Sequence, residues 1–211
     1  MRTCIVNRLT ILIVLLTLAV ALPGLFYLKG GDSYEFTNLH GHVVTIYNKG
    51  IYRFDTLLKA GCFKGGDVGI ILFTLPFLIF CLHYDSKHTG SSKSRLLLSS
   101  FLSNSLYHSS SAAFGASYNN IFLIYMLYFG LSLFLFIYIN TTMDVSKLKI
   151  NFNKVPLKGF YIFLYLSGFA LFLAWLPDII YSLTNNTTLV NIEVYTTEIT
   201  YLLDMFVLIN Y

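Results

Sequence analysis

The sequence predicts an all-α membrane protein: a helical bundle of five full transmembrane spans and a partial sixth, with a small extracytoplasmic loop subdomain. Of its 211 residues, 56% are hydrophobic and only 11% are charged, whereas about a quarter of an ordinary soluble domain is charged. So few polar residues could not cover the surface of a soluble fold. Five apolar stretches also have about the 20 residues that a helix needs to cross a bilayer. We therefore expect residues 1–211 to form a single transmembrane bundle domain.

The predicted spans follow one another along the chain. They are Leu9–Leu28, Val68–Tyr84, Leu96–Ala116, Ile121–Ile139 and Phe160–Leu183. Asp178, near the end of the fifth, is the only Asp, Glu, Lys or Arg within them. A sixth apolar segment, Ile199–Tyr211, would be roughly 20 Å long as a helix and could not cross alone. We expect it to be a re-entrant segment or the sign of a truncated version of a longer protein.

The first apolar segment has a second interpretation. Ala19-Val20-Ala21 follows a basic start and an apolar run, which is the pattern of a cleaved secretory signal. The apolar run continues as far as Leu28, however, and so has the length of a transmembrane helix. An uncleaved first helix is therefore the expectation.

Basic residues alternate between the predicted loops. Lys and Arg occur before the first span and in loops 85–95 and 141–158, whereas loops 116–120 and 184–198 have none. Loops rich in Lys and Arg stay in the cytoplasm, so the N-terminus is predicted to be cytoplasmic. Loop 29–67 is the exception, since it holds five basic residues, but it also holds four acidic ones. Long loops count less in this rule, and we place it outside.

Loop 29–67 also contains a predicted β-hairpin. Val43–Tyr47 is a β-branched run, and Asn48-Lys49-Gly50 can form a turn. Ile51–Phe54 would then be the second strand.

A short helix is predicted after this hairpin. Asp55 stands at an N-cap position before an amphipathic stretch that Gly61 could end. The loop as a whole is expected to form a lid over the bundle, with Arg53, Asp55 and Asp67 as candidate contacts. Whether the lid only shields the bundle or faces a ligand stays open.

The third span is far more polar than the others. One helical stripe, with spacings of 4, 3, 1, 3 and 4, contains Ser100, Asn104, Tyr107, His108, Ser111 and Gly115. The opposite face contains Leu98, Leu102, Leu106 and Ala113. Unpaired polar groups are costly in hydrocarbon, so we expect the stripe to face the bundle interior. Its members either join helices by hydrogen bonds or line a functional pocket.

Several carboxylic acids are expected near the outer half of the bundle, where His108 also lies. Counted by helical rise, His108 is about 18 Å from the inner boundary and Asp204 roughly 8 Å from the outer one. The candidate polar pocket comprises Ser100, Asn104, Tyr107, His108, Ser111, Asp178 and Asp204. An acid–histidine pair could relay protons, bind a cation or act as a buried polar clasp.

No catalytic or metal-binding motif is present in the sequence. It has no Gly-rich phosphate loop, no zinc motif and no nucleophile elbow, so we predict no catalytic residue, metal or cofactor and do not expect an enzyme. The expected partners are the lipid bilayer and other membrane proteins, not nucleic acid. In order, the function classes are an accessory or structural membrane protein, a component of a small-solute or proton-coupled transporter, and a membrane-embedded enzyme.

Two short segments resemble a known family. Gly50–Thr56 reads GIYRFDT, a span opens at Asp67, and Ala113–Asn119 reads AFGASYN. These segments resemble an uncharacterised family of prokaryotic multi-pass membrane proteins. The resemblance implies a location in a prokaryotic cytoplasmic membrane and further spans after the position of Tyr211, but no activity.

Overall fold

The computed structural model describes residues 2–88, 91–148 and 157–185, together with residues 187, 189, 193, 194, 199, 203 and 204. The chain divides into two compact units. One comprises Met1–Glu35 and Thr45–Leu148 and is called the bundle unit. The other comprises Phe36–Val44 and Lys149–Tyr211 and is called the α6 unit.

Four helices in the described part of the chain are long and apolar enough to cross a membrane. They are Cys4–Phe26, Leu57–Lys87, Phe122–Thr142 and Lys158–Asn185, which confirms four of the predicted spans by length and composition. The predicted third span is also a helix, of 24 residues, but its many polar residues leave it outside this set. The predicted partial span Ile199–Tyr211 lies almost wholly outside the described residues.

The bundle unit contains five helices in chain order. They are α1 (Arg2–Phe26), α2 (Leu57–Gly69), α3 (Leu75–Lys87), α4 (Ser92–Gly115) and α5 (Phe122–Thr142).

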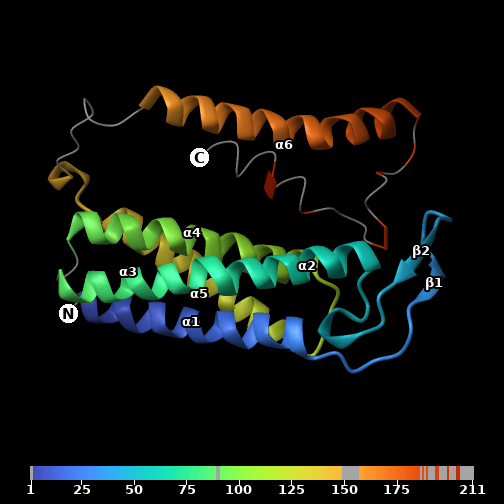
Figure 1. Cartoon of the computed structure of the whole chain (residues 1–211), viewed down its shortest axis with the longest axis horizontal. Coiled ribbons are helices and arrows are strands. Elements are labelled where there is room, and N and C mark those ends of the chain that lie inside the picture. Colours follow the sequence, from blue (N-terminus) through green and yellow to red (C-terminus); the bar gives the residue numbers. More distant parts are fainter. Residues whose placement is uncertain are drawn as a thin grey trace. The chain divides into compact units, whose positions relative to one another are not determined.

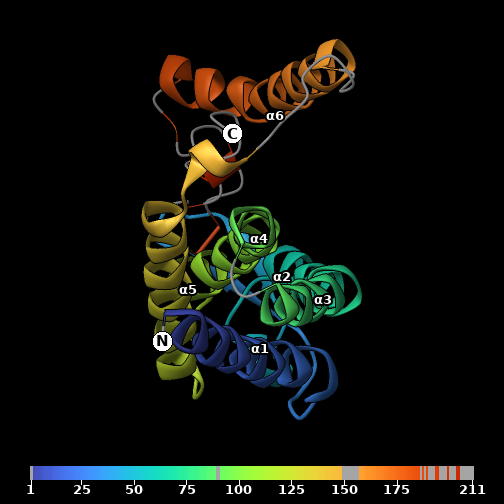
Figure 2. The same ribbon diagram turned by 90° about the vertical axis from the view of Figure 1, so that its left-hand side faces the viewer.

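A π-helical segment, Ile70–Thr74, joins α2 and α3 into one continuous rod. Helix α1 packs against α2, α3 and α5, while α4 packs against α3 and α5. Figure 1 shows α1, the α2–α3 rod and α4 extending along one direction. Figure 2 looks along that direction and shows α5 lengthwise, so α5 crosses the other helices.

The core is built from stripes of side chains at helical spacing. The α1 stripe contains Val6, Thr10, Ile13, Thr17, Val20 and Gly24, and the α5 stripe contains Tyr125, Tyr128, Ser132, Leu135 and Ile139. Spacings of three and four place each set on one helix face. The hydroxyls of Thr10 and Thr17 donate to carbonyls four residues earlier in α1, at 2.9 and 2.8 Å. Thr10 and Thr17 therefore enter the core with their hydroxyl hydrogen bonds satisfied within α1.

Helix α4 turns a different face to the core from the one that the sequence predicted. Leu98 and Leu102 have no exposed surface, whereas Ser100 and Asn104 are exposed, so the prediction that the stripe faces the interior was wrong for Ser100 and Asn104. The Ser100 hydroxyl donates to the carbonyl of Leu96 at 2.9 Å. A serine that bonds to its own helix needs no partner on another helix. Polarity alone is therefore a poor guide to which face of α4 is inside.

The predicted hairpin has a different second strand. Strand β2 (Val43–Ile46) pairs with β1 (Tyr34–Thr37), which precedes it in the chain. Ile51–Phe54 was predicted to be its partner, but Gly50–Tyr52 forms a 3₁₀ turn instead. The side-chain oxygen of Asn38 accepts from two backbone N–H groups in the β1–β2 connection, at 3.0 and 2.8 Å. Such Asx interactions stabilise a turn, and this one fixes the hairpin upstream of the expected position.

The second span begins earlier than the sequence predicted. Thr56, not Asp55, is the N-cap residue, and its hydroxyl accepts from the N–H of Lys59. The helix does not stop at Gly61 but continues through the π-helical segment to Lys87. A glycine inside a helix costs about 1 kcal/mol, and burial of Ala60 on the same helix shows how packing offsets that cost.

Helix α6 (Leu157–Asn185) is the long element of the α6 unit, and it contains Pro177. None of the residues in its most apolar 18-residue window is buried. The indole N–H of Trp175 donates to a carboxylate oxygen of Asp204 at 3.0 Å. Asp178 is half-buried.

Candidate functional site

A buried carboxylate on α2 joins three elements of the bundle unit. The side chain of Asp67 is fully buried, and its Oδ1 lies 3.1 Å from Nε2 of His108 on α4. Its Oδ2 accepts a hydrogen bond of 2.7 Å from the hydroxyl of Tyr52 in the 3₁₀ turn. Asp67, His108 and Tyr52 are called the Asp67 cluster. The cluster lies near the C-terminal ends of α1 and α2.

Helix α1 closes over this cluster at Gly24. A Cβ atom at this position would lie 2.0 Å from Oδ2 of Asp67 and 3.0 Å from the hydroxyl of Tyr52. Real Cβ atoms do not approach a carboxylate oxygen so closely. Gly24 therefore lets the α1 backbone seal the carboxylate from its surroundings.

His108 uses one ring nitrogen in the cluster. Its side chain is 12% exposed, and its buried Nδ1 has no hydrogen-bond partner among the described residues. Its ring lies 6.0 Å from that of Tyr128 on α5. The pair can exist as a carboxylate with a neutral imidazole that donates from Nε2, or as an ion pair. The sequence predicted an acid near His108, and the acid that the structure brings to it is Asp67.

Tyr52 is held as a hydrogen-bond donor. Burial, and then the nearby charge of Asp67, raise the pKa of the Tyr52 phenol well above its usual range. The phenol ring also stacks on Phe63 of α2, with ring centroids 5.3 Å apart. A phenol with a raised pKa keeps its proton at neutral pH, so it donates to the carboxylate.

Asp55 ties together the segments Gly50–Thr56 and Ala113–Asn119. It is fully buried, and its Oδ1 accepts from the backbone N–H of Ser117 at 2.8 Å. The Ser117 hydroxyl donates to the carbonyl of Phe54 at 3.2 Å. Predicted as a helix cap and lid contact, Asp55 instead anchors the turn that follows α4.

A third buried carboxylate lies where α3 ends and α4 begins. Asp85 has no exposed surface, and its Oδ1 accepts from Ser94 at 2.6 Å and lies 3.2 Å from Nε of Arg95. Asp85, Ser94 and Arg95 are called the Asp85 cluster. The sequence argument placed these residues in a polar loop and missed the cluster. An acid and a base on opposite sides of a short predicted turn were the signal that could have revealed it.

The α4 members of the predicted polar pocket differ in their exposure. His108 joins the Asp67 cluster, Tyr107 and Ser111 are half-buried, and the other two α4 members, Ser100 and Asn104, are exposed. The remaining members, Asp178 and Asp204, belong to the α6 unit.

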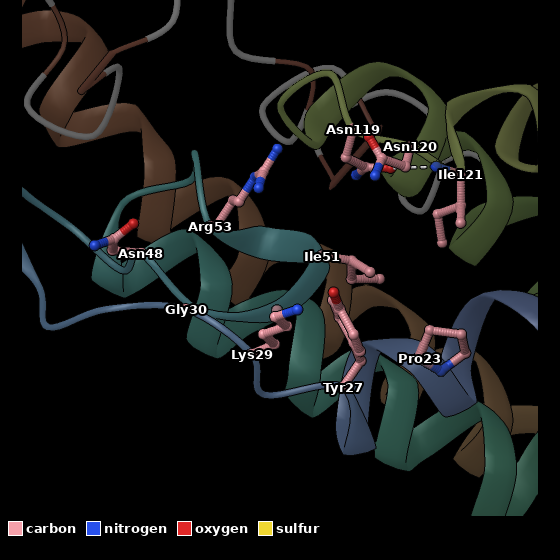
Figure 3. Close-up of a pocket in the computed structure, with 11 residues that line it drawn as sticks. Pro23, Tyr27, Lys29, Gly30, Asn48, Ile51, Arg53, Asn119, Asn120 and Ile121 are labelled. Carbon is pink, nitrogen blue, oxygen red and sulfur yellow. Dashed lines mark hydrogen bonds between the residues drawn. The ribbon is translucent and has the colours of Figure 1, made fainter.

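The Asp67 cluster does not line a pocket of about 550 Å³ that is formed within the bundle unit. This pocket is bounded by the end of α1, the loop before β1, the segment around Gly50 and the turn before α5. Arg53, a predicted lid contact, lines it together with Lys29 (Figure 3). Charged side chains thus occupy two separate places: paired in the core, and exposed around a pocket.

No group of three or more His, Cys, Asp or Glu residues able to hold a metal ion occurs in the described part of the chain. Comparison of the chain with family models, curated proteins and solved structures gives no match. The contacts within the bundle unit therefore carry the functional argument.

Proposed function

We propose that this chain is a multi-pass integral membrane protein with an accessory or structural role, and that its buried charges join helices and do not carry a substrate. The observation that supports this role is the pairing of two of the three buried aspartates that the structure describes in the bundle unit. Asp67 is bonded to His108 and Tyr52, and Asp85 to Ser94 and Arg95.

The energetic argument comes from the cost of charge in a membrane. A charged residue at the centre of a transmembrane helix costs about 2.5–3.5 kcal/mol on insertion scales. Pairing and hydrogen bonding offset that cost. A transported ion or solute needs groups that face a path. Neither Asp67 nor His108 lines the pocket of the bundle unit.

A flux measurement tests the accessory role. The full chain is reconstituted into liposomes that contain a pH-sensitive dye, and a potassium gradient with valinomycin sets the membrane potential. We expect proton entry at the rate of protein-free liposomes. Faster entry that Asp67→Asn abolishes, and that the exposed-site variant Asp32→Asn retains, would contradict the accessory role.

The orientation of the bundle unit is part of the proposal. We place the N-terminus in the cytoplasm, because the Lys and Arg residues alternate between loops. Native cysteines provide the test, since Cys4 and Cys62 are exposed and Cys81 is buried. In single-cysteine variants on intact cells, an impermeant maleimide should label Cys62 but label Cys4 only after permeabilisation. The opposite pattern would invert the topology.

A component of a proton-coupled transporter is the second candidate. Asp67 lies three residues before the π-helical segment Ile70–Thr74, and π-helical segments are frequent at functional sites. The buried Nδ1 of His108, which has no hydrogen-bond partner among the described residues, could accept a proton. The flux measurement above decides between this candidate and the accessory role.

A further inference from the structure

We infer that the pocket lined by Lys29 and Arg53 binds the phosphate group of an anionic phospholipid headgroup. This inference goes beyond the accessory role. It rests on the proposed membrane insertion, which the cysteine labelling tests separately. Its starting point is an exception in the sequence: loop 29–67 contains five Lys and Arg residues beside its four acidic ones, although the other Lys- and Arg-containing segments mark the cytoplasmic side.

The charges around the pocket are of one sign. None of its eleven lining residues is Asp or Glu, and two of them, Lys29 and Arg53, are cations. Both side chains are exposed, and neither forms an ion pair with any residue that the structure describes. The Arg53 guanidinium lies 4.5 Å from the centre of the Phe54 ring, a contact that leaves its N–H groups available. Two such cations attract an anion.

Uncharged donors accompany the cations. Tyr27 and Asn120 line the same pocket, and no hydrogen bond joins either side chain to another described residue. Figure 3 shows the Tyr27 hydroxyl and the Lys29 ammonium directed toward the middle of the group, with Arg53 on the side where Asn119 and Asn120 lie. Phosphate oxygens accept from ammonium, guanidinium, hydroxyl and amide donors alike.

Backbone hydrogen bonds hold the two segments that carry these cations. The N–H of Gly50 donates to the carbonyl of Lys29 at 3.0 Å, and the N–H of Asn48 donates to the carbonyl of Arg53 at 3.1 Å. Gly50 has a φ of 66°, and a Cβ there would lie 2.1 Å from the carbonyl oxygen of Tyr27. Only glycine allows the backbone at position 50 to approach the backbone of Tyr27 so closely. The pocket is therefore preformed, which lowers the entropic cost of binding.

The surroundings favour a lipid as the source of the phosphate. Phe26 and Leu28, which flank Tyr27, are 75% and 56% exposed, so an apolar surface adjoins the pocket. Tyr27 itself has the amphipathic ring that is enriched at membrane–water interfaces. A volume of about 550 Å³ is within the usual range of small-ligand pockets, about 300–1,000 Å³. A headgroup could place its phosphate in the pocket while its chains remain in the adjoining bilayer.

A titration of the purified full chain in a non-ionic detergent tests this inference. The probes are dihexanoyl-phosphatidylglycerol and inorganic phosphate, and isothermal titration calorimetry measures the binding of each. Saturable binding of the lipid is expected, with inorganic phosphate about tenfold weaker or more. The combined Lys29→Gln and Arg53→Gln variant should bind the lipid at least about tenfold more weakly, since a single charge-assisted hydrogen bond accounts for about that factor.

Lys49→Gln is the matched control, because it removes one positive charge from the same loop at a residue that does not line the pocket. It should change the affinity by less than about twofold, as expected for a screened charge outside the site. An equal loss of lipid affinity in Lys49→Gln and in the double variant, or no loss in either, would show that the lipid does not bind in this pocket. Equal affinity for inorganic phosphate and the lipid, with the same loss in the double variant, would overturn the lipid source in favour of a soluble phosphate.

Discussion

Asp67 and Asp85, two of the buried aspartates of the bundle unit, differ in the partners that they have. Asp85 pairs with Arg95, ten residues away across the short connection between α3 and α4. Asp67 pairs with His108, 41 residues away on another helix. Both oxygens of Asp67 are bonded, whereas one oxygen of Asp85 has no hydrogen-bond partner among the described residues.

The difference indicates what each cluster contributes. Arginine is always charged in proteins, so the Asp85 cluster places a permanent cation beside the carboxyl group and fixes a local turn. The Asp67 cluster has a histidine in place of the arginine. It also joins α2, α4 and the 3₁₀ turn and lies under Gly24 of α1. The Asp67 cluster should therefore contribute more to the stability of the bundle.

Removal of the Asp67 carboxylate should have the largest effect. Asp67→Ala leaves the donors of His108 and Tyr52 buried without an acceptor, and we expect a loss of about 2–5 kcal/mol in unfolding free energy. Equilibrium unfolding in detergent micelles measures it. Asp32→Ala, at an exposed position, is the control and should change stability by under about 0.5 kcal/mol. Equal effects of the two substitutions would show that Asp67 contributes no more to the stability of the bundle than an exposed aspartate.

The Asp85 cluster should respond less. Arg95→Met keeps much of the side-chain volume but leaves Asp85 with the Ser94 hydroxyl alone. We expect a loss of about 1.5–3 kcal/mol, the contribution of a hydrogen bond to a charged group. Lys93→Met, at an exposed position two residues earlier, is the control. A loss larger than that of Asp67→Ala in the same unfolding experiment would reverse the comparison.

The sequence predicted the apolar helices well, because the length and composition of a span are local properties. Four helices, including α1 and α5, are where we expected them. The face of α4 that is buried was not predictable in the same way, because the Ser100 hydroxyl donates its hydrogen bond to a carbonyl of its own helix. Likewise Gly61 predicted a helix end, but packing between helices carries the α2–α3 rod past it.

The candidate site was predictable only in part. His108 was singled out as an ionisable group in a span, and its partner class, a carboxylic acid, was expected. Which acid it meets depends on how α2 and α4 pack, and no local pattern specifies that packing. Asp85 and Arg95 were missed because a charged pair next to a turn also fits an exposed loop.

The closure of α1 over the Asp67 cluster can be tested through Gly24. Gly24→Ala adds a methyl group where Oδ2 of Asp67 lies, and overpacking of this kind costs about 1–3 kcal/mol. The decisive measurement is a double-mutant cycle with Asp67→Ala. With the carboxylate removed, the added methyl group has room, so the double variant should lose less stability than the sum of the single variants. Additive losses would show that Gly24 and Asp67 do not contact each other.

The smallest expected effect concerns the face of α4. Ser100 and Ser109 each donate to a carbonyl of their own helix at 2.9 Å, but Ser100 is exposed and Ser109 has no exposed surface. Valine at either position carries the same small helix penalty. Ser100→Val should therefore change the unfolding free energy by under about 0.5 kcal/mol. Ser109→Val should lower it by about 1–3 kcal/mol, because the extra methyl groups enter a packed core. The reverse order would return the Ser100 side of α4 to the interior of the bundle unit.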